Sequence, residues 1–581
     1  MKQTLTSKTV IFDIETNGLL LDVTKFWVGV TYCKETKEKR VFRNATKLVE
    51  YLNEADTIVG HNIIGYDIPT LNKLSAICIR DDINVVDTLI LAKLVYYDKD
   101  KDWSHSLDAY GKRLGEYKGS YNDWSKYTKE MEEYCIQDVK VTYKLYTHLK
   151  RKATWLPETA LQLEQDVQKI ITQQYVHGWL FDIKAAQKLH IELLQERDIA
   201  EAKLFETFTP KFLPDGKTKT PKRPFKRLGV TTVGEHQPIK LLEFNPSSGK
   251  HIIWWVESVL GKQNWVLTEK GNPKTDATTL KDMFSSEPFL EPLLHYLEVN
   301  KLLGQLAEGD KAWLKLVKKD GRIHGSADIL GAVTGRFTHS NPNIAQVPAV
   351  DAYKGEEARS LFTVPKGYKL VGADASGLEL RTLSHYLSWY DGGAYGQQLL
   401  EGDIHTANQI AAGLPTRGNA KTFIYGFLYG AGDAKIGLIV GGSSKEGSRL
   451  KKKFLAKTKG LANLVADVKK AAKKKWIKGL TGRRLFIRSP HSALNTLLQS
   501  AGAYYMKYLL VETDKMIKEK EYDAHFVGNI HDEFQIEVRE NQAEALARDL
   551  EALFIVVGEK LDMKIKMEGE AKIGTNWKET H

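Results

Sequence analysis

The sequence predicts an α/β multidomain protein, and three observations support this. At 581 residues the chain exceeds what one hydrophobic core usually holds, so about three to five domains or subdomains are expected. Strand-like and helical segments alternate over the first 150 residues. Further along, strand-like segments near residues 370 and 530 each end at aspartate, with a long, mostly helical stretch between them.

Four of the acidic side chains in the first 150 residues lie in sequence contexts that suit metal ligands. Residues 9–15 read as a buried strand that Asn17-Gly18 ends, and alternation along this strand puts Asp13 and Glu15 on one face. Asp67 follows in the block 62–67, and Asp138 lies on an expected helix one turn after Tyr134. Each acid alone is more often a surface carboxylate. Together they predict a site for two divalent ions and a water that attacks a phosphodiester, with the tyrosine positioning the water.

The middle of the chain is mostly helical. Helical periodicity runs from about residue 160 to 208 and returns from 249 to about 318. Between them, residues 209–240 are rich in proline, lysine and arginine and carry eight basic and two acidic side chains. This stretch is predicted to be an exposed insertion or a flexible loop.

The C-terminal part contains a second pair of carboxylates. The strand-like run 368–373 ends at Asp374, and two strands at 526–530 and 534–538 flank His531-Asp532-Glu533 as a hairpin. Aspartate oxygens are the hard ligands that Mg²⁺ prefers. A site for two such ions, which can activate a hydroxyl and stabilise a leaving pyrophosphate, is therefore predicted.

A basic helix is expected between these two aspartates. Thr416 is suited to cap its start, and Gly430 stands where a glycine often follows a helix end. Arg417, Lys421 and Tyr425 recur every four residues and so lie on one stripe of this helix. Two cations on one stripe suit a triphosphate.

The charge distribution points to a polyanion surface after residue 150. Residues 1–150 carry 22 basic and 22 acidic side chains, whereas the remainder carries 62 and 51. Residues 449–478 hold twelve basic side chains against Asp467 alone. That stretch is either a solvated helical surface or a groove for a phosphate backbone, and the sequence leaves both open.

The cysteine spacing and the length of the apolar runs indicate the cellular compartment in which the protein is expected. Cys33, Cys78 and Cys135 form no C-x-x-C spacing, so neither a zinc site nor a disulfide framework is indicated. No apolar run approaches the ~18 residues of a membrane span, and the polar start at residues 1–8 does not resemble a signal peptide. A cytoplasmic protein without a membrane partner is expected.

The N-terminal set resembles the three motifs of proofreading 3′→5′ exonucleases of the DnaQ-like, ribonuclease-H-like group. The blocks Asp13-Ile14-Glu15, 62–67 and 134–138 match in order and approximate spacing. The resemblance implies that Asp13, Glu15, Asp67 and Asp138 are metal ligands, that Tyr134 is catalytic, and that this nuclease is active.

The C-terminal set resembles the family A DNA polymerases, the polymerase I group, and within it the replicative polymerases of T-seven-like bacteriophages. The resemblance covers nearly the whole chain and is carried by residues 331–336, 374–381, 402–406, 419–432 and 489–502. It implies template-directed synthesis of phage-type DNA from dNTPs with proofreading. It also implies a right-hand polymerase of palm, thumb and fingers after the exonuclease domain.

The resemblance assigns a role to each site residue. Asp374 and Asp532, with the Ala375 carbonyl, would hold two Mg²⁺ ions, for which Mn²⁺ can substitute, and Glu533 would lie close by. Nucleotide contacts would come from Arg417, Lys421, Tyr425, His405 and Glu379. Among these, Lys421 would also protonate the leaving group, Glu379 would exclude a 2′-hydroxyl, and a tyrosine at 425 implies ready use of dideoxynucleotides. DNA contacts would come from Arg336, Gln499 and His531 in the minor groove and from Tyr429 at the template base.

The same resemblance gives the expected domains and partners. The exonuclease would occupy residues 1–150, the thumb 151–316 with the insertion near 209–240, the palm 317–386 and 495–581, and the fingers 387–494. Primer-template DNA and dNTPs are the expected ligands of an expected monomer, with a helicase-primase and a single-strand-binding protein as possible replisome partners.

The chain departs from the T-seven-like group in the thumb. There a long insertion captures host thioredoxin, whereas residues 209–240 are much shorter, which argues against thioredoxin as a partner. This basic stretch is expected to hold duplex DNA directly, in a salt-sensitive manner. Its apolar residues offer the alternative of docking another partner: Phe212, Leu213, Phe225 and Leu228.

Three rival functions stay open on the sequence. A nuclease whose second half only grips DNA is one, although the intact Asp374 and Asp532 pair argues against it. A non-catalytic DNA-binding protein is another. The third is a repair polymerase, but no 5′ nuclease domain is expected before residue 1.

Overall fold

The computed structural model describes residues 7–99, 102–220, 225–227, 230–232, 234–268, 270–284 and 287–581. Residues 1–6 of the polar start, and Leu228 of the insertion, lie outside this part. The chain forms two compact units, one made of residues 1–180, 324–347 and 362–581 and the other of 181–323 and 348–361. No helix of the described part is both long and apolar enough to span a bilayer.

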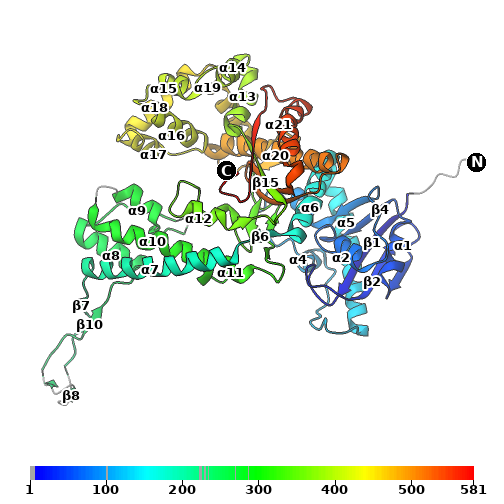
Figure 1. Ribbon diagram of the computed structural model, residues 1–581, viewed down its shortest axis with the longest axis horizontal. Coiled ribbons are helices and arrows are strands. Elements are labelled where there is room, and N and C mark those ends of the chain that lie inside the picture. The colour runs from blue at the N-terminus through cyan, green and yellow to red at the C-terminus, as the bar shows by residue number, and fades with distance from the viewer. Residues whose placement is uncertain are drawn as a thin grey trace, which may run out of the picture. The chain divides into compact units, whose positions relative to one another are not determined.

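The N-terminal part of the first unit is a five-stranded sheet in the order β3-β2-β1-β4-β5, flanked by helices (Figure 1). Strands β1, β2 and β3 are antiparallel neighbours, whereas β4 and β5 run parallel to β1. The strands are β1 (Thr9–Thr16), β2 (Phe26–Cys33), β3 (Lys39–Phe42), β4 (Thr57–Gly60) and β5 (Asn84–Asp87). The helices are α1 (Ala45–Leu52), α2 (Asp67–Leu74), α3 (Thr88–Val95), α4 (Leu107–Leu114) and α5 (Lys129–Lys152).

Burial of apolar side chains explains why α5 packs against β1. Val10, Ile11 and Phe12 of β1 are completely buried, as the run of β-branched and apolar residues predicts. Helix α5 buries Met131, Cys135 and Val139 on its sheet-facing side and packs on β1 and β2. The predicted strand 9–15 and the predicted helix carrying Tyr134 and Asp138 are thus confirmed.

Helix α6 (Glu158–His177) joins this sheet to the C-terminal part of the first unit. It packs against α3, α20 and β18. The fully buried Glu164 accepts hydrogen bonds from Tyr504 (2.6 Å) and from the ammonium of Lys507 (2.7 Å). A buried carboxylate requires such partners, since losing one leaves an uncompensated charge. The predicted thumb range 151–316 therefore takes in a helix that belongs to the first unit.

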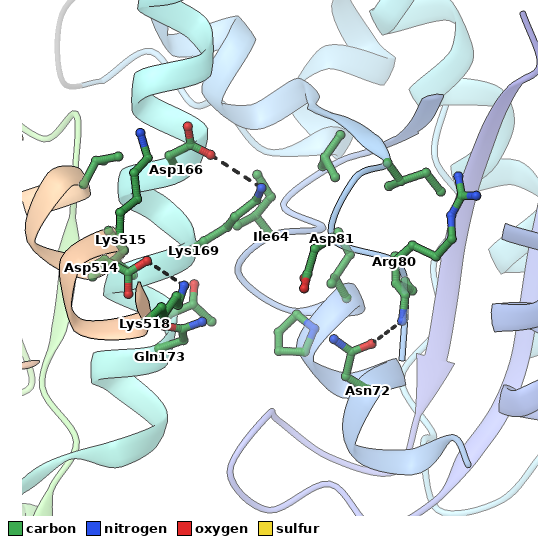
Figure 2. A pocket seen from close by; sticks show the side chains of 18 residues that line it. Ile64, Asn72, Arg80, Asp81, Asp166, Lys169, Gln173, Asp514, Lys515 and Lys518 are labelled. Atoms are coloured by element: carbon green, nitrogen blue, oxygen red, sulfur yellow. Dashed lines mark hydrogen bonds and ion pairs between the residues drawn. The ribbon is translucent and has the colours of Figure 1, made fainter. Parts of the chain in front are cut away.

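A pocket of about 480 Å³ lies where α2 and the following loop face α6 and α20 (Figure 2). Apolar side chains such as Ile64 and Ile170 line it, and pairs such as Lys518 and Asp514 (2.6 Å) lie on its wall. None of the predicted site residues is among those that line it. The chemistry therefore has to be sought elsewhere in the first unit.

The C-terminal part of the first unit contains a four-stranded antiparallel sheet in the order β18-β19-β15-β20. Helices α20 and α21 pack together, and α21 covers β15 and β20. Apart from the helical insertion described below, the α-helices and strands of this part are β12 (Ser326–Asp328), β13 (Thr338–Ser340), β14 (Phe362–Thr363), β15 (Tyr368–Ala375), α20 (Ala493–Glu519), β18 (Ala524–Ile530), β19 (Glu533–Arg539), α21 (Ala543–Lys560) and β20 (Gly569–Gly574).

A mostly helical subdomain is inserted between β15 and α20, and its apolar side chains form a core of their own. Its elements are α13 (Leu378–Asp391), α14 (Ala394–Glu401), α15 (Ile404–Ala412), α16 (Arg417–Leu428), α17 (Asp433–Leu438), α18 (Ser444–Lys457), α19 (Leu461–Ala472), β16 (Trp476–Lys478) and β17 (Arg484–Phe486). Ten lysines of the basic stretch 449–478 are exposed. Exposure fits both interpretations of that stretch.

The second unit is built on helices with one long hairpin (Figure 1). In its core the Phe208 and Phe244 rings stack, and Trp255 meets Phe208 edge-to-face. Its elements are α7 (Ile183–Thr207), β7 (Lys211–Pro214), β8 (Phe225–Arg227), β9 (Val230–Thr232), β10 (Ile239–Leu242), α8 (Gly249–Leu260), α9 (Ala277–Phe284), α10 (Glu291–Leu303), α11 (Trp313–Leu316), β11 (Arg322–Ile323) and α12 (Gly355–Ser360). Strand β6 (Trp179–Phe181) interrupts the helical run expected for 160–208, because the run breaks at Gly178, whose φ of 69° favours glycine.

The stretch 209–240 forms strands rather than a structureless loop. Strand β7 pairs with β10 in antiparallel register, from Lys211 opposite Leu242 to Pro214 opposite Ile239. Phe212 and Ile239 are 68% and 61% exposed, so the base of this hairpin buries little apolar surface. The predicted exposure of the insertion holds for these described side chains.

Candidate active sites

Adjacent strands of the C-terminal sheet bring the two predicted aspartates together. Asp374 in β15 lies opposite Glu533 in β19, and Asp532 occupies the turn just before β19. The Ala375 amide donates a hydrogen bond to the Asp532 carbonyl oxygen (3.0 Å). The prediction that a strand end and a hairpin turn place these residues is confirmed.

The charges at this site repel one another. Partial desolvation by the surrounding protein, and then the charge of Asp532, raise the pKa of Asp374 to about 7. The Asp374 side chain is nevertheless exposed at the surface. Burial, and then the charge of Glu379, raises the pKa of Asp532 to about 6. Clustered carboxylates of this kind fit hard divalent cations, whose charge relieves the repulsion.

Glu533 differs from its two neighbours because it is buried and already has donors. Its oxygens accept hydrogen bonds from Trp577 Nε1 (2.6 Å) and His581 Nδ1 (2.9 Å). Neither contact was predicted from the sequence, since both donors lie more than 40 residues away. Asp374 and Asp532 are therefore the better candidates for direct ligands.

Helix α16 carries the predicted basic stripe. The Thr416 side chain accepts from the Asn419 amide, and Gly430 has a φ of 72°, so both predicted ends of the helix are confirmed. Arg417 and Lys421 are exposed, while Tyr425 is half-buried.

Asp403 links this stripe to the start of α15. It accepts the Arg417 Nε hydrogen bond at 2.6 Å and also caps α15 through the amides of His405 and Thr406. Burial and the nearby Arg417 lower the pKa of His405, whose buried Nδ1 has no partner among the described residues. The cluster of His405, Arg417 and Lys421 is thus rich in donors for an anion.

Glu379 on α13 connects the end of α16 to the segment that carries Arg336. Its Oε1 accepts hydrogen bonds from Arg336 Nη2 and the Tyr429 hydroxyl, both at 3.1 Å. The Tyr425 and Tyr429 rings stack with centroids 6.4 Å apart. Burial, and then the charges of Glu379 and Asp532, raises the pKa of Tyr425. Two of the predicted nucleotide residues, Tyr425 and Glu379, therefore lie near Asp532.

The predicted minor-groove set is only partly joined by contacts. Burial, and then the nearby Arg336 charge, lowers the pKa of His531. Gly335, with a φ of 83°, lets the chain pass so close to Tyr504 that an added Cβ would lie 2.8 Å from its ring. Gln499 lies half-buried on α20, and no described contact joins it to Arg336 or His531.

The four acids of the N-terminal motifs also converge. Asp13 and Glu15 lie on β1, buried Asp67 begins α2, and buried Asp138 lies on α5. Burial, followed by the charges of the other three, raises the pKa of Asp13. Burial raises the pKa of Glu15 to about 7 and that of Asp138 to about 6. Asp138 Oδ1 is buried without a hydrogen-bond partner, so the donor set fits hard cations.

Three further residues reach this second site and were missed by sequence reasoning. Lys118 Nζ lies 2.6 Å from Asp138 Oδ2 and 4.8 Å from the Tyr134 ring centroid. Trp124 Nε1 donates to Glu15 Oε2 at 3.0 Å. Cys135 Sγ lies 3.7 Å from Asp13 Oδ2. Lys118 and Trp124 come from a segment without periodicity, so no pattern points to them. Cys135 lies within the predicted 134–138 motif, but it was used only to show that no C-x-x-C spacing occurs.

The comparisons identify the family. A family model described as DNA polymerase family A matches residues 230–579. The DNA-directed DNA polymerases of Enterobacteria phage T3 and Escherichia phage T7 are each 35% identical over 98% of this chain and all of their own length. The chain belongs to DNA polymerase family A. Within that family it is similar to the T-seven-like group, as the sequence motifs predicted.

A solved family A structure shares the fold. The POL domain of Pol1 from M. smegmatis, solved in complex with DNA primer-template and dNTP, superposes with a TM-score of 0.78 at 20% identity, covering 99% of this chain and 96% of that one. The predicted polymerase fold is confirmed. The alignments with the phage relatives run over 707 and 708 positions, so those family A polymerases contain segments that this 581-residue chain lacks.

Proposed function

We propose that this family A member extends a DNA primer on a template with dNTPs and removes mispaired 3′ ends at a separate site. The observation that carries the proposal is the convergence of Asp374 and Asp532 with Glu379 and Tyr425. The carboxylates can hold the metal ions that bind a triphosphate, the half-buried ring can stack near the sugar and base, and the exposed cations of α16 can neutralise phosphates. A protein that only grips DNA has no need of this arrangement.

Asp374, Asp532 and the Ala375 carbonyl are the residues proposed to hold divalent cations. Family A polymerases depend on metal ions, and Mg²⁺ is the ion proposed here, with two per site and Mn²⁺ able to replace it. When bound, such ions supply activation of the primer 3′-hydroxyl and stabilisation of the leaving pyrophosphate. The raised pKa values of both aspartates favour a tightly held cation above about pH 7.

The donors of α15 and α16 are proposed to bind the triphosphate. Arg417 pairs with Asp403, so it has a defined position, and Lys421 is free of such a pairing in the described contacts. Lys421 lies one helical turn from Arg417 and can approach the same phosphate chain. As charge moves to the pyrophosphate, fixed cations stabilise it. Lys421 is also proposed to give a proton to the leaving pyrophosphate.

Selection of the nucleotide is proposed to involve Glu379 and the two tyrosines. Glu379 is held by Arg336 and Tyr429 and would meet a 2′-hydroxyl beside Tyr425. Arg336, His531 and Gln499 are proposed to contact minor-groove acceptors, which are common to correct base pairs. These contacts test the geometry of the pair without reading its sequence.

The second site is proposed to be a 3′→5′ exonuclease. Its sheet order β3-β2-β1-β4-β5 fits a ribonuclease-H-like domain, and Asp13, Glu15, Asp67 and Asp138 converge on it. Tyr134 shares a face of α5 with Asp138 and can orient a water. Lys118 sits between Asp138 and Tyr134 and can neutralise a scissile phosphate.

Extension and digestion of a 5′-labelled primer on a DNA template separate the two activities. With Mg²⁺ and four dNTPs, the wild type is expected to extend the primer. Asp532→Ala is expected only to shorten it, and Asp13→Ala with Glu15→Ala only to extend it. If the wild type shortens the primer even at high dNTP concentration, polymerisation by this chain is disproved.

The hairpin of the second unit is proposed to retain duplex DNA. Replacing residues 215–238 by Asn-Gly keeps Pro214 opposite Ile239 and closes the pair with a two-residue turn. This variant is expected to make shorter products per binding event at ~0.15 M salt, with a shallower salt dependence, because phosphate contacts are lost. Lys217→Gln with Lys219→Gln tests the charges alone. Unchanged product lengths in the shortened variant would favour partner docking through residues such as Phe212.

The remaining partners are proposed on the family resemblance. Primer-template DNA and dNTPs are the substrates, and a helicase-primase and a single-strand-binding protein are candidate replisome partners. The chain is proposed to act as a monomer. Thioredoxin is not proposed as a partner because the insertion at residues 209–240 is much shorter than the one that captures thioredoxin in the T-seven-like group.

A further inference from the structure

A buried thiol lies within the proposed exonuclease site. Cys135 is completely buried on α5, between Tyr134 and the motif residue Asp138. Its Sγ lies 3.4 Å from the Asp13 carbonyl oxygen and 3.7 Å from Asp13 Oδ2. One potential ligand atom each from Asp13, Glu15 and Cys135 lies within 4.8 Å of the other two.

These separations suit a tetrahedral ion with mixed oxygen and sulfur ligands. Metal bonds of about 2.0 Å to oxygen and 2.3 Å to sulfur put an oxygen and a sulfur ligand ~3.5 Å apart in a tetrahedron. The distance from Sγ to Asp13 Oδ2 is already close to this value. Only small side-chain rotations would bring Glu15 to the same ion.

A fourth carboxylate lies near the cluster. Asp138 is 3% exposed, and its Oδ1 has no hydrogen-bond partner. Its charge is among those that act most strongly on Asp13, so the two carboxylates are close. Asp138 lies outside the group of three ligand atoms, and its Oδ2 pairs with Lys118 Nζ at 2.6 Å. Its unpartnered Oδ1 is therefore available as a fourth ligand after a side-chain rotation.

We propose that Asp13, Glu15, Cys135 and Asp138 form a site for a thiophilic divalent ion of the Zn²⁺ class, which competes with Mg²⁺ and switches off the exonuclease. Mg²⁺ uses oxygen ligands and leaves the thiol alone, whereas Zn²⁺ binds thiolate, imidazole and carboxylate. Coordination replaces the S–H bond by a sulfur–metal bond, and the proton goes to solvent. No zinc-binding spacing is visible in the sequence, because these ligands come from β1 and α5, which lie far apart in the chain.

The proposed ion is expected to inhibit the exonuclease site and not the polymerase site. An ion drawn toward Sγ sits on the α5 side of the carboxylates and occupies oxygens that the exonuclease needs for Mg²⁺. The polymerase aspartates have no cysteine nearby, because the three cysteines of the chain are Cys33, Cys78 and Cys135. Low Zn²⁺ in excess Mg²⁺ is therefore expected to suppress proofreading while synthesis continues.

Cd²⁺ provides a probe that does not depend on activity. The full-length wild type titrated with Cd²⁺ is expected to show the ultraviolet thiolate-to-metal charge-transfer band, saturating at one ion per chain. Cys135→Ser should lose the band, Asp13→Asn should weaken binding at least about tenfold, and Cys78→Ala, at an exposed position, should keep both. A Cys33→Ala, Cys78→Ala protein, in which Cys135 is the only thiol, should also keep the band.

The result that overturns the proposal is a wild type with no band at saturating Cd²⁺, or a band that persists unchanged in Cys135→Ser. Digestion of single-stranded DNA in excess Mg²⁺ adds the functional arm: Cys135→Ser should need at least about tenfold more Zn²⁺ for half inhibition than the wild type. The inhibitory role rests on the proposed exonuclease. An absent nuclease activity in Mg²⁺ would disprove that function and leave the absorbance titration to decide the metal site, whereas an active nuclease without the band disproves the metal site alone.

Discussion

Lys421→Met is expected to slow nucleotide incorporation by about 10²–10³-fold, because the variant removes a fixed cation from the place where charge develops on the pyrophosphate. Lys421 lies on the exposed stripe of α16, one turn after Arg417, and its charge contributes to lowering the pKa of His405. Methionine keeps most of the length of the side chain, so the helix and its core face should be unchanged. The measurement is single-turnover incorporation of one dNTP on a primer-template in Mg²⁺.

Two matched variants separate charge from proton transfer and from general surface effects. Lys421→Arg keeps the charge but cannot readily give up a proton, so recovery of the rate would assign an electrostatic role alone. Lys445→Met removes an exposed lysine from the first turn of α18 in the same subdomain and should leave the rate unchanged. A wild-type rate for Lys421→Met would remove this residue from the proposed site.

The sequence predicted the elements of both sites because local patterns determine them. The buried strand with Asp13 and Glu15 and the helix from Thr416 to Gly430 depend on alternation, capping and glycine conformation, which neighbouring residues decide. The family motifs then supplied the order of the acids. The family and the polymerase fold followed from these and are confirmed, whereas the roles of single residues stay predictions.

What the sequence did not predict comes from segments that fold against distant parts of the chain. Lys118 and Trp124 belong to an irregular segment whose position is decided by packing on α5 and β2, so no period points to them. Asp403 was visible only as part of a motif, because its pairing with Arg417 requires α15 and α16 to be side by side. The packing of α6 on α20 was also not predicted, since the periodicity of α6 does not reveal that its buried Glu164 bonds to α20.

Glu15→Gln is expected to stabilise the metal-free protein at pH 8 while weakening its response to Mg²⁺. Burial raises the pKa of Glu15 to about 7, above the value of 4.5 expected for the unfolded chain. A group of this kind favours the folded state below about pH 4.5, and that contribution is lost as the pH rises through about 7. Asp13, Asp67 and Asp138 also have raised pKa values, so the effect of Glu15 adds to theirs.

The expected gain from Glu15→Gln is on the order of 2 kcal/mol in EDTA at pH 8, and it should shrink as the pH falls toward 4.5. Glutamine keeps an oxygen that can accept the Trp124 Nε1 hydrogen bond, so the local packing should survive. Hydrogen exchange of the β1 amides reports the local free energy of opening. Glu50→Gln, at an exposed acid on α1, is the matched control and should leave this free energy unchanged.

Mg²⁺ should reverse the order of stability. If the proposed site is correct, the wild type binds the ion with all four carboxylates and gains stability by mass action, whereas Glu15→Gln has lost one ligand and gains less. The wild type is therefore expected to be the less protected of the two in EDTA at pH 8 and to recover with Mg²⁺. If Glu15→Gln is destabilised in EDTA at pH 8, or if added Mg²⁺ protects both proteins equally, the four acids do not act as one cation site.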